Sequence, residues 1–168
     1  MTIRVSRPDF ILAFGLVACS LTAHPANAQL GGLFGSKPVV PEIKVDELRK
    51  LKLSEAKKDS PYVLVDVRTK EESSVSLLPG AITKFEYELH PERYKGRTVI
   101  AYCTSGYRSG QYAQKLVQQG AKAKNFKGSI LEWCRTGLPL VSPEGEPTNR
   151  VHTYSSKNKV PDKYDAIP

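Results

Sequence analysis

One cysteine has the neighbours that chemistry at sulfur requires. Cys103 ends a β-branched and aromatic run, and Gly106 and Arg108 follow it before a segment with helical spacing. This pattern is typical of a strand, a tight loop and a helix, so it places the thiol at a helix N-terminus. The unpaired N–H groups there, together with an arginine, favour the thiolate. We therefore expect Cys103 to be a nucleophile rather than an ordinary cysteine at a strand end.

The spacing of residues in this loop distinguishes between several classes of enzyme. Four residues lie between Cys103 and Arg108, whereas the loop of tyrosine phosphatases has five. The sequence around Ser109 misses the Gly-x-Ser-x-Gly of a serine hydrolase by one position. The 3 histidines show no metal-ligand spacing, so we expect neither a metal nor another cofactor. Gly106 tolerates positive φ, which lets the loop turn its amides inward towards the sulfur or an anion.

The elements that must position Cys103 alternate between strands and helices. Strands are indicated at 43–45, 62–67, 81–82, 98–102 and 123–126, and helices after Asp46, at 70–76, from Ser109 to Gly120, and at 130–136. This alternation predicts an α/β fold with a small parallel sheet, helices on both faces and right-handed crossovers. Ligands bind at the carboxyl ends of the strands of such a sheet, which is where Asp66 and Cys103 lie.

Four stretches of the chain, taken together, resemble the rhodanese family. They are Val-Asp-Val-Arg at 65–68, Leu-Pro-Gly-Ala-Ile at 78–82, the loop at 103–109, and the segment 128–139. They occur in the family's order over about residues 43–141. The resemblance implies a sulfurtransferase that takes a sulfane sulfur from a donor such as thiosulfate and holds it as a persulfide. The sulfur would then pass to a thiophilic acceptor, a thiol or a cyanide-like nucleophile.

The resemblance also implies roles for individual residues. Cys103 would be the catalytic nucleophile, Arg108 would line the pocket, and backbone N–H groups of the loop would hold the anionic end of the donor. Asp66 and Arg68 would support the strand ends rather than take part in the chemistry. The residues implied to bind substrate are Thr104, Ser105, Gly106, Tyr107, Arg108 and Ser109.

Two departures from the family pattern concern residues outside the loop. The usual Gly-His pair before Ile-Pro-Gly-Ala is absent, because the chain reads Ser-Leu-Leu-Pro-Gly-Ala at 76–81. A Gly-Gly pair is replaced by Gly128 and Ser129. The Gly-His pair shapes the sheet edge in the family and does not carry the chemistry, so the expected fold is unchanged.

Two other functions stay open as alternatives. The first is a persulfide or redox relay that binds a thiol-redox protein and turns over little thiosulfate. The second is a phosphatase or arsenate reductase, which the loop disfavours because relatives with that chemistry carry one more residue between the cysteine and the arginine.

The N-terminus has the features of an export signal. A positive start, an apolar run and the sequence Ala-Asn-Ala at 26–28 fit a cleaved signal over residues 1–28, followed by a linker at 29–41. Leu-Val-Ala-Cys at 16–19 also resembles a lipobox, in which Cys19 would be lipidated. Both alternatives predict an exported protein in the periplasm or cell envelope. A lipid on Cys19 would be its only attachment to the membrane.

Composition fits one globular domain. The 168 residues are 40% hydrophobic, which is enough for a core, and the net charge of +8 is scattered without the motifs of a nucleic-acid-binding protein. We therefore expect no nucleic-acid partner. Cys134 is expected to be an inert packed thiol, although a disulfide with Cys103 is the alternative. The domain is expected at 42–141, and its extension at 142–168 should lie as irregular structure over the surface.

Overall fold

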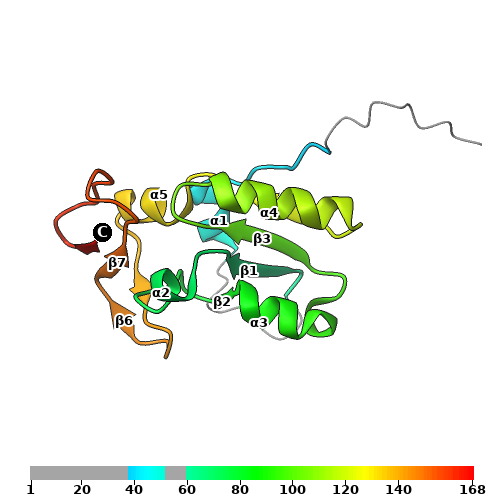
Figure 1. The fold of residues 1–168 in the computed structure, drawn as a ribbon, viewed down its shortest axis with the longest axis horizontal. Helices are drawn as coiled ribbons and strands as arrows, with labels where there is room; N and C mark the ends of the chain where they lie inside the picture. The colour runs from blue at the N-terminus through cyan, green and yellow to red at the C-terminus, as the bar shows by residue number, and fades with distance from the viewer. Residues whose placement is uncertain (1–37, 52–59) are drawn as a thin grey trace, which may run out of the picture. The chain divides into compact units, whose positions relative to one another are not determined.

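A four-stranded parallel sheet forms the centre of the protein. The computed structural model describes residues 38–51 and 60–168. The strands are β1 (Tyr62–Asp66), β2 (Ala81–Thr83), β3 (Thr98–Tyr102) and β4 (Ala123–Asn125), in the order β2-β1-β3-β4 (Figure 1). β1 pairs in parallel with β2 and β3, and β3 pairs in parallel with β4. The predicted α/β class with a small parallel sheet is confirmed.

Helices cover both faces of this sheet. They are α1 (Val45–Lys50), α2 (Lys70–Ser73), α3 (Lys84–Leu89), the 3₁₀ helix η2 (Pro91–Tyr94), α4 (Tyr107–Gln118) and α5 (Ser129–Arg135). Helices α1 and α5 share one core cluster with Leu64 and Ile100 of the sheet. Helix α4 packs against Val65 and Ala101, which point to the opposite face. The alternation of side chains along each strand therefore fills two apolar layers, as a doubly covered parallel sheet requires.

Several predicted boundaries are wrong by a few residues. The strand expected at 43–45 is reduced to an isolated bridge at Glu42, and Asp46 lies in the first turn of α1, because Lys44 is the N-cap. Helix α2 ends three residues early, at Ser73. The polar stretch 84–94, in which no helix or strand was predicted, forms α3 and η2. The helix expected after Asp46 has apolar positions as far as Ala56, and residues 52–56 lie outside the described residues.

The C-terminal extension packs on the domain, as expected. Strand β5 (Leu140–Val141) pairs antiparallel with β6 (Pro147–Thr148), and β7 (Arg150–His152) pairs in parallel with β8 (Asp165–Ile167). Val151 and Tyr164 of the extension belong to the core cluster that includes α1 and α5. The strands β6, β7 and β8 of the extension were not predicted, whereas most of the chain between β7 and β8 is irregular, as predicted.

The predicted signal, the lipobox and most of the linker lie outside the described residues. Within residues 38–51 and 60–168, no helix has the length and apolar character needed to cross a membrane.

Candidate active site

The loop between β3 and α4 holds Cys103 at the carboxyl end of the sheet. Its backbone N–H donates to the Ser129 hydroxyl at 3.0 Å, and the residue is 1% exposed. Gly106 turns the chain with φ of 95°, and a Cβ there would clash with the backbone carbonyl of Lys127. Only glycine meets both demands. Helix α4 consequently starts at Tyr107, two residues before the predicted start.

Hydrogen-bond donors surround the sulfur of Cys103. The backbone N–H of Gly106 donates to Sγ at 3.1 Å, and the hydroxyl oxygens of Ser109 and Ser129 lie 3.5 and 3.8 Å from it. Burial by itself raises the pKa of the thiol. Hydrogen bonds from the Ser109 side chain and from backbone N–H groups of the loop outweigh burial, so the pKa of Cys103 lies below its ordinary value.

Arg108 forms a bidentate ion pair with Glu72 of α2. Its two terminal nitrogens lie 2.6 and 2.7 Å from the carboxylate oxygens, and Nη2 also donates to the Thr104 hydroxyl at 2.9 Å. The Thr104 hydroxyl donates to the same carboxylate at 3.0 Å. Burial raises the pKa of Glu72, but the hydrogen bonds from Arg108, the Thr69 backbone and Thr104 prevail and lower it to about 2. This network fixes the loop to α2.

Asn125 at the end of β4 supports the loop from its other side. Its amide nitrogen donates to the Gly106 carbonyl at 3.2 Å, and its amide oxygen accepts from the Ser109 hydroxyl at 2.7 Å. Ser129 stands where the family usually has a second glycine, and it keeps a left-handed φ of 54°. Its hydroxyl donates to the Phe126 carbonyl at 2.8 Å, so it ties the start of α5 to Cys103.

A cavity of about 260 Å³ opens beside the sulfur. Its lining residues are Cys103, Thr104, Ser105, Tyr107, Arg108, Tyr154 and Asn158. Five of these were predicted from the sequence. Gly106 and Ser109 instead face the sulfur from the loop, and Tyr154 and Asn158 come from the C-terminal extension. A larger cavity of about 390 Å³, lined partly by Lys70 and Phe85, does not include Cys103.

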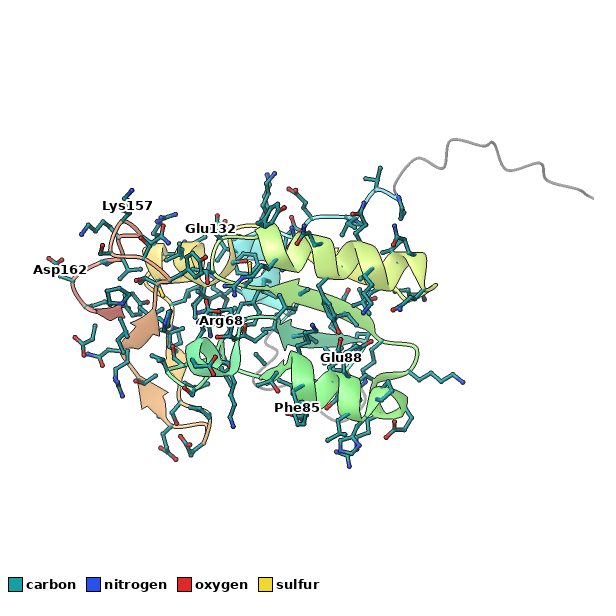
Figure 2. The ribbon with its side chains drawn as sticks, viewed as in Figure 1. Arg68, Phe85, Glu88, Glu132, Lys157 and Asp162 are labelled. Carbon is teal, nitrogen blue, oxygen red and sulfur yellow. The ribbon has the colours of Figure 1, made fainter. Side chains whose placement is uncertain are left out.

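Asp66 and Arg68 do not line the Cys103 cavity, although Arg68 contributes to the larger one. The Arg68 guanidinium binds the Asp66 carboxylate, with Nη2 to Oδ2 at 2.6 Å, and also donates to the Ser76 carbonyl at 2.5 Å. The Tyr102 hydroxyl donates to Asp66 at 2.9 Å and accepts from the Leu78 backbone at 3.1 Å. Both charged side chains are buried, and Figure 2 shows Arg68 inside the molecule. The geometry supports the structural role expected for the pair.

The second cysteine lies in a different environment. Cys134 and Cys103 are both free thiols, and Cys134 is fully buried in the core cluster under α5. Burial there raises the pKa of Cys134 to about 12. Over the described parts of the chain, no three histidine, cysteine or acidic residues gather in a way that could hold a metal ion.

Comparisons with known proteins agree with this fold and loop. Residues 49–136 match the Rhodanese-like domain family. A protein of Allochromatium vinosum described as a sulfurtransferase is 40% identical over 107 residues, which are 60% of this chain and 99% of the relative.

Two solved structures are similar in fold. A thiosulfate sulfurtransferase from Pseudomonas aeruginosa is 22% identical with a TM-score of 0.51, and the match covers 64% of this chain and 21% of that one. A protein of unknown function from Rhodopseudomonas palustris, described as a possible tyrosine phosphatase, is 22% identical with a TM-score of 0.50 over 60% of this chain and 84% of that one.

The doubly covered parallel sheet and the cysteine loop at its carboxyl edge define a rhodanese-like α/β domain. The chain belongs to the rhodanese family.

Proposed function

We propose that Cys103 takes a sulfane sulfur from a small anionic donor such as thiosulfate and passes it to a thiophilic acceptor. In the first step the thiolate attacks the outer sulfur of thiosulfate. The S–S bond of the donor breaks, and sulfite leaves with its electron pair. In the second step a nucleophile such as cyanide attacks the outer sulfur of the Cys103 persulfide. Thiocyanate forms, and the thiolate is restored without an oxidant or a reductant.

The observation that carries this proposal is the ring of donors around the sulfur. The Gly106 N–H and the Ser109 hydroxyl lower the pKa of Cys103, which increases the nucleophilic thiolate near neutral pH. The same donors can stabilise the terminal sulfur of a persulfide, because that sulfur also carries negative charge. The loop turns tightly at Gly106 and is short. A short loop encloses a single sulfur atom better than it encloses a tetrahedral phosphate.

The hydrogen bonds that Arg108 makes within the protein argue against phosphatase chemistry. Both terminal nitrogens of its guanidinium are engaged by Glu72 and Thr104, so they are not free to bind the oxygens of a phosphate. The similarity to the Rhodopseudomonas palustris protein is at 22% identity and concerns the fold alone.

Export and the relay alternative also belong to the proposal. We propose that the chain works outside the cytoplasm, in the periplasm or cell envelope, because of the signal features over residues 1–28. A thiol-redox protein is then the competing acceptor, and capture of a partner through a mixed disulfide at Cys103 would favour a relay over turnover of thiosulfate.

The test is transfer of sulfur from thiosulfate to cyanide, followed as thiocyanate. The wild type should be active, Cys103→Ser should lose the activity, and Cys134→Ala should keep it within about twofold, because its thiol is packed in the core. Intact mass after incubation with thiosulfate should show one added sulfur on the wild type and none on Cys103→Ser. Equal rates for the wild type and Cys103→Ser would overturn the proposal.

A further inference from the structure

The C-terminal extension supplies one wall of the Cys103 cavity. Tyr154 and Asn158 line it, although the family match ends at residue 136. Figure 1 shows the extension, coloured orange to red, at the end of the sheet from which α4 starts. This wall is therefore an addition to the matched domain.

Tyr154 is held in an unusual backbone conformation. Its φ of 67° lies in the left-handed region, which costs a bulky residue about 1 kcal/mol or more. Its N–H donates to Nδ1 of His152 at 3.1 Å, and the Asn158 amide donates to the carbonyl of buried Thr153 at 2.7 Å. These bonds fix the turn in spite of its strain, and such strain is commonly retained at functional sites.

The ring of Tyr154 presents aromatic surface at the mouth of the cavity. Tyr154 is 68% exposed, and Tyr107 on α4 is 73% exposed. The guanidinium carbon of Arg108 lies 5.5 Å from the centre of the Tyr154 ring. Arg108 is the one cationic side chain among the residues that line the cavity, and Glu72 balances its charge. The mouth therefore offers an apolar contact rather than a strong positive charge.

The cavity is also larger than a bare inorganic acceptor needs. A volume of about 260 Å³ equals roughly nine waters at about 30 Å³ each. Cyanide would leave most of this volume to solvent. A thiol with a hydrocarbon chain would fill more of it and would remove aromatic surface from water.

We propose that Tyr154 is a specificity-determining residue that favours an organic thiol as the sulfur acceptor, with the carbon chain of the thiol against its ring. This inference rests on the proposed function. The acceptor thiolate attacks the outer sulfur of the Cys103 persulfide, the bond between the two sulfurs breaks, and Cys103 leaves as a thiolate. A dithiol then closes to a disulfide and releases sulfide, so its two thiols are oxidised as the sulfane sulfur is reduced.

The experiment compares acceptors on enzyme supplied with thiosulfate. Cyanide is followed as thiocyanate, and dihydrolipoate, with its hydrocarbon chain, is followed as released sulfide. Mercaptoethanol is also followed as released sulfide, because a second mercaptoethanol molecule attacks the persulfide of the first, forms the disulfide and displaces sulfide. Tyr154→Asn removes the ring with a residue that tolerates the left-handed region, and Tyr154→Phe keeps the ring. Phe85→Asn is the matched control, because Phe85 is 75% exposed and points away from α3, outside the Cys103 cavity (Figure 2).

Tyr154→Asn should raise the KM for dihydrolipoate about five- to tenfold, with cyanide and mercaptoethanol changed less than about twofold. Tyr154→Phe and Phe85→Asn should resemble the wild type with all three acceptors. An unchanged KM for dihydrolipoate in Tyr154→Asn would overturn the inference, and so would an equal loss with cyanide. A wild type that transfers sulfur to none of the acceptors would instead overturn the proposed function, and the inference with it.

Discussion

Cys103 and Cys134 are both buried, but their thiols differ in the direction in which the protein shifts the pKa. They are 1% and 0% exposed, yet the pKa of Cys103 is lowered and that of Cys134 is raised to about 12. Cys103 follows a strand and faces the N–H of Gly106, which has no helical partner to donate to. Cys134 lies inside α5, among the apolar side chains of the core. Burial therefore does not decide thiol reactivity here, and the nearby donors do.

The largest effect expected from this contrast is in alkylation. At pH 7 a thiol with a pKa of about 12 is a thiolate in about one molecule in 10⁵. Iodoacetamide should therefore label Cys103 of the native protein at least about a thousandfold faster than Cys134, as read by peptide mass mapping. As the pH is raised, the rate of Cys103 labelling should reach a plateau at a pH below the ordinary pKa of a cysteine thiol. The rate of Cys134 labelling should still be rising at that pH. Comparable labelling of the two thiols in native protein would contradict the contrast, and unfolded protein, where both should react alike, is the control.

The next effect concerns the backbone turn that aims the donors. Gly106→Ala places a Cβ against the Lys127 carbonyl at a φ of 95°, so the loop must move away from the sulfur. Sulfur transfer should fall about a hundredfold, and the pKa of Cys103 should move up towards that of an ordinary thiol. Gly120→Ala is the matched control, because Gly120 has a φ of 83° and nothing within 4 Å of an added Cβ. It should lose about 1 kcal/mol of stability and keep its activity. An active Gly106→Ala protein would show that the turn does not set the reactivity of the thiol.

These contrasts also show how far the sequence could be taken. The identity of Cys103 as the nucleophile candidate, and the left-handed turn at Gly106, follow from local pattern, because strand, loop and helix are adjacent in the chain. The fold class follows from the alternation of strands and helices. The start of α4 did not follow, since it depends on the left-handed N-cap at Gly106, and neither did the end of α2, where Ser74 is the C-cap.

A smaller effect tests the anchor of the loop. The ordinary pKa of a glutamate side chain is 4.5, and the pKa of Glu72 in the folded protein is about 2. The ionised Glu72, through its ion pair with Arg108 and its hydrogen bonds with Thr69 and Thr104, therefore stabilises the fold above about pH 4.5. This contribution, up to about 3 kcal/mol for all these contacts together, is lost as the pH falls towards 2. Glu72→Gln should flatten the acid limb of a plot of unfolding free energy against pH. It should also lower sulfur transfer about tenfold, because Arg108 loses the negative charge of its partner and one of the two carboxylate oxygens that accept its hydrogen bonds.

Glu88→Gln is the matched control for Glu72→Gln. Glu88 is half exposed and lies 3.9 Å from Lys84 on the same helix, so its loss should leave both measurements close to the wild type. If the acid limb of Glu72→Gln matches that of the wild type, the ion pair between Glu72 and Arg108 does not contribute to the pH dependence of the unfolding free energy.

The residues that the sequence missed share one property. Glu72, Asn125 and Ser129 reach the loop from α2, β4 and α5, and Tyr154 reaches it from the chain after β7. Their partners lie 16 or more positions away in the chain. Periodicity and spacing report on neighbours along the chain, so they carry no signal for such contacts. The capping box of Thr69 and Glu72 was readable as a motif, but it explains only the start of α2 and not the ion pair with Arg108.

The smallest effect separates the two kinds of donor around Cys103. The Ser109 hydroxyl has one proton and three acceptors within reach: the Asn125 amide oxygen at 2.7 Å, the Gly106 carbonyl at 3.2 Å and the sulfur at 3.5 Å. Because the shortest contact is with Asn125, the hydroxyl is only partly available to the thiolate. Ser109→Ala should raise the pKa of Cys103 by about half a unit, measured from the pH dependence of alkylation, and reduce the thiolate about threefold at neutral pH.

Ser73→Ala is the control for Ser109→Ala, since this buried serine donates to carbonyls within α2 and to its cap. It should leave the alkylation profile of Cys103 unchanged. A rise of two units or more in Ser109→Ala would make the hydroxyl the main donor. No rise at all would leave the backbone N–H groups as the whole cause of the lowered pKa, and the difference between Cys103 and Cys134 would then rest on the backbone of the loop alone.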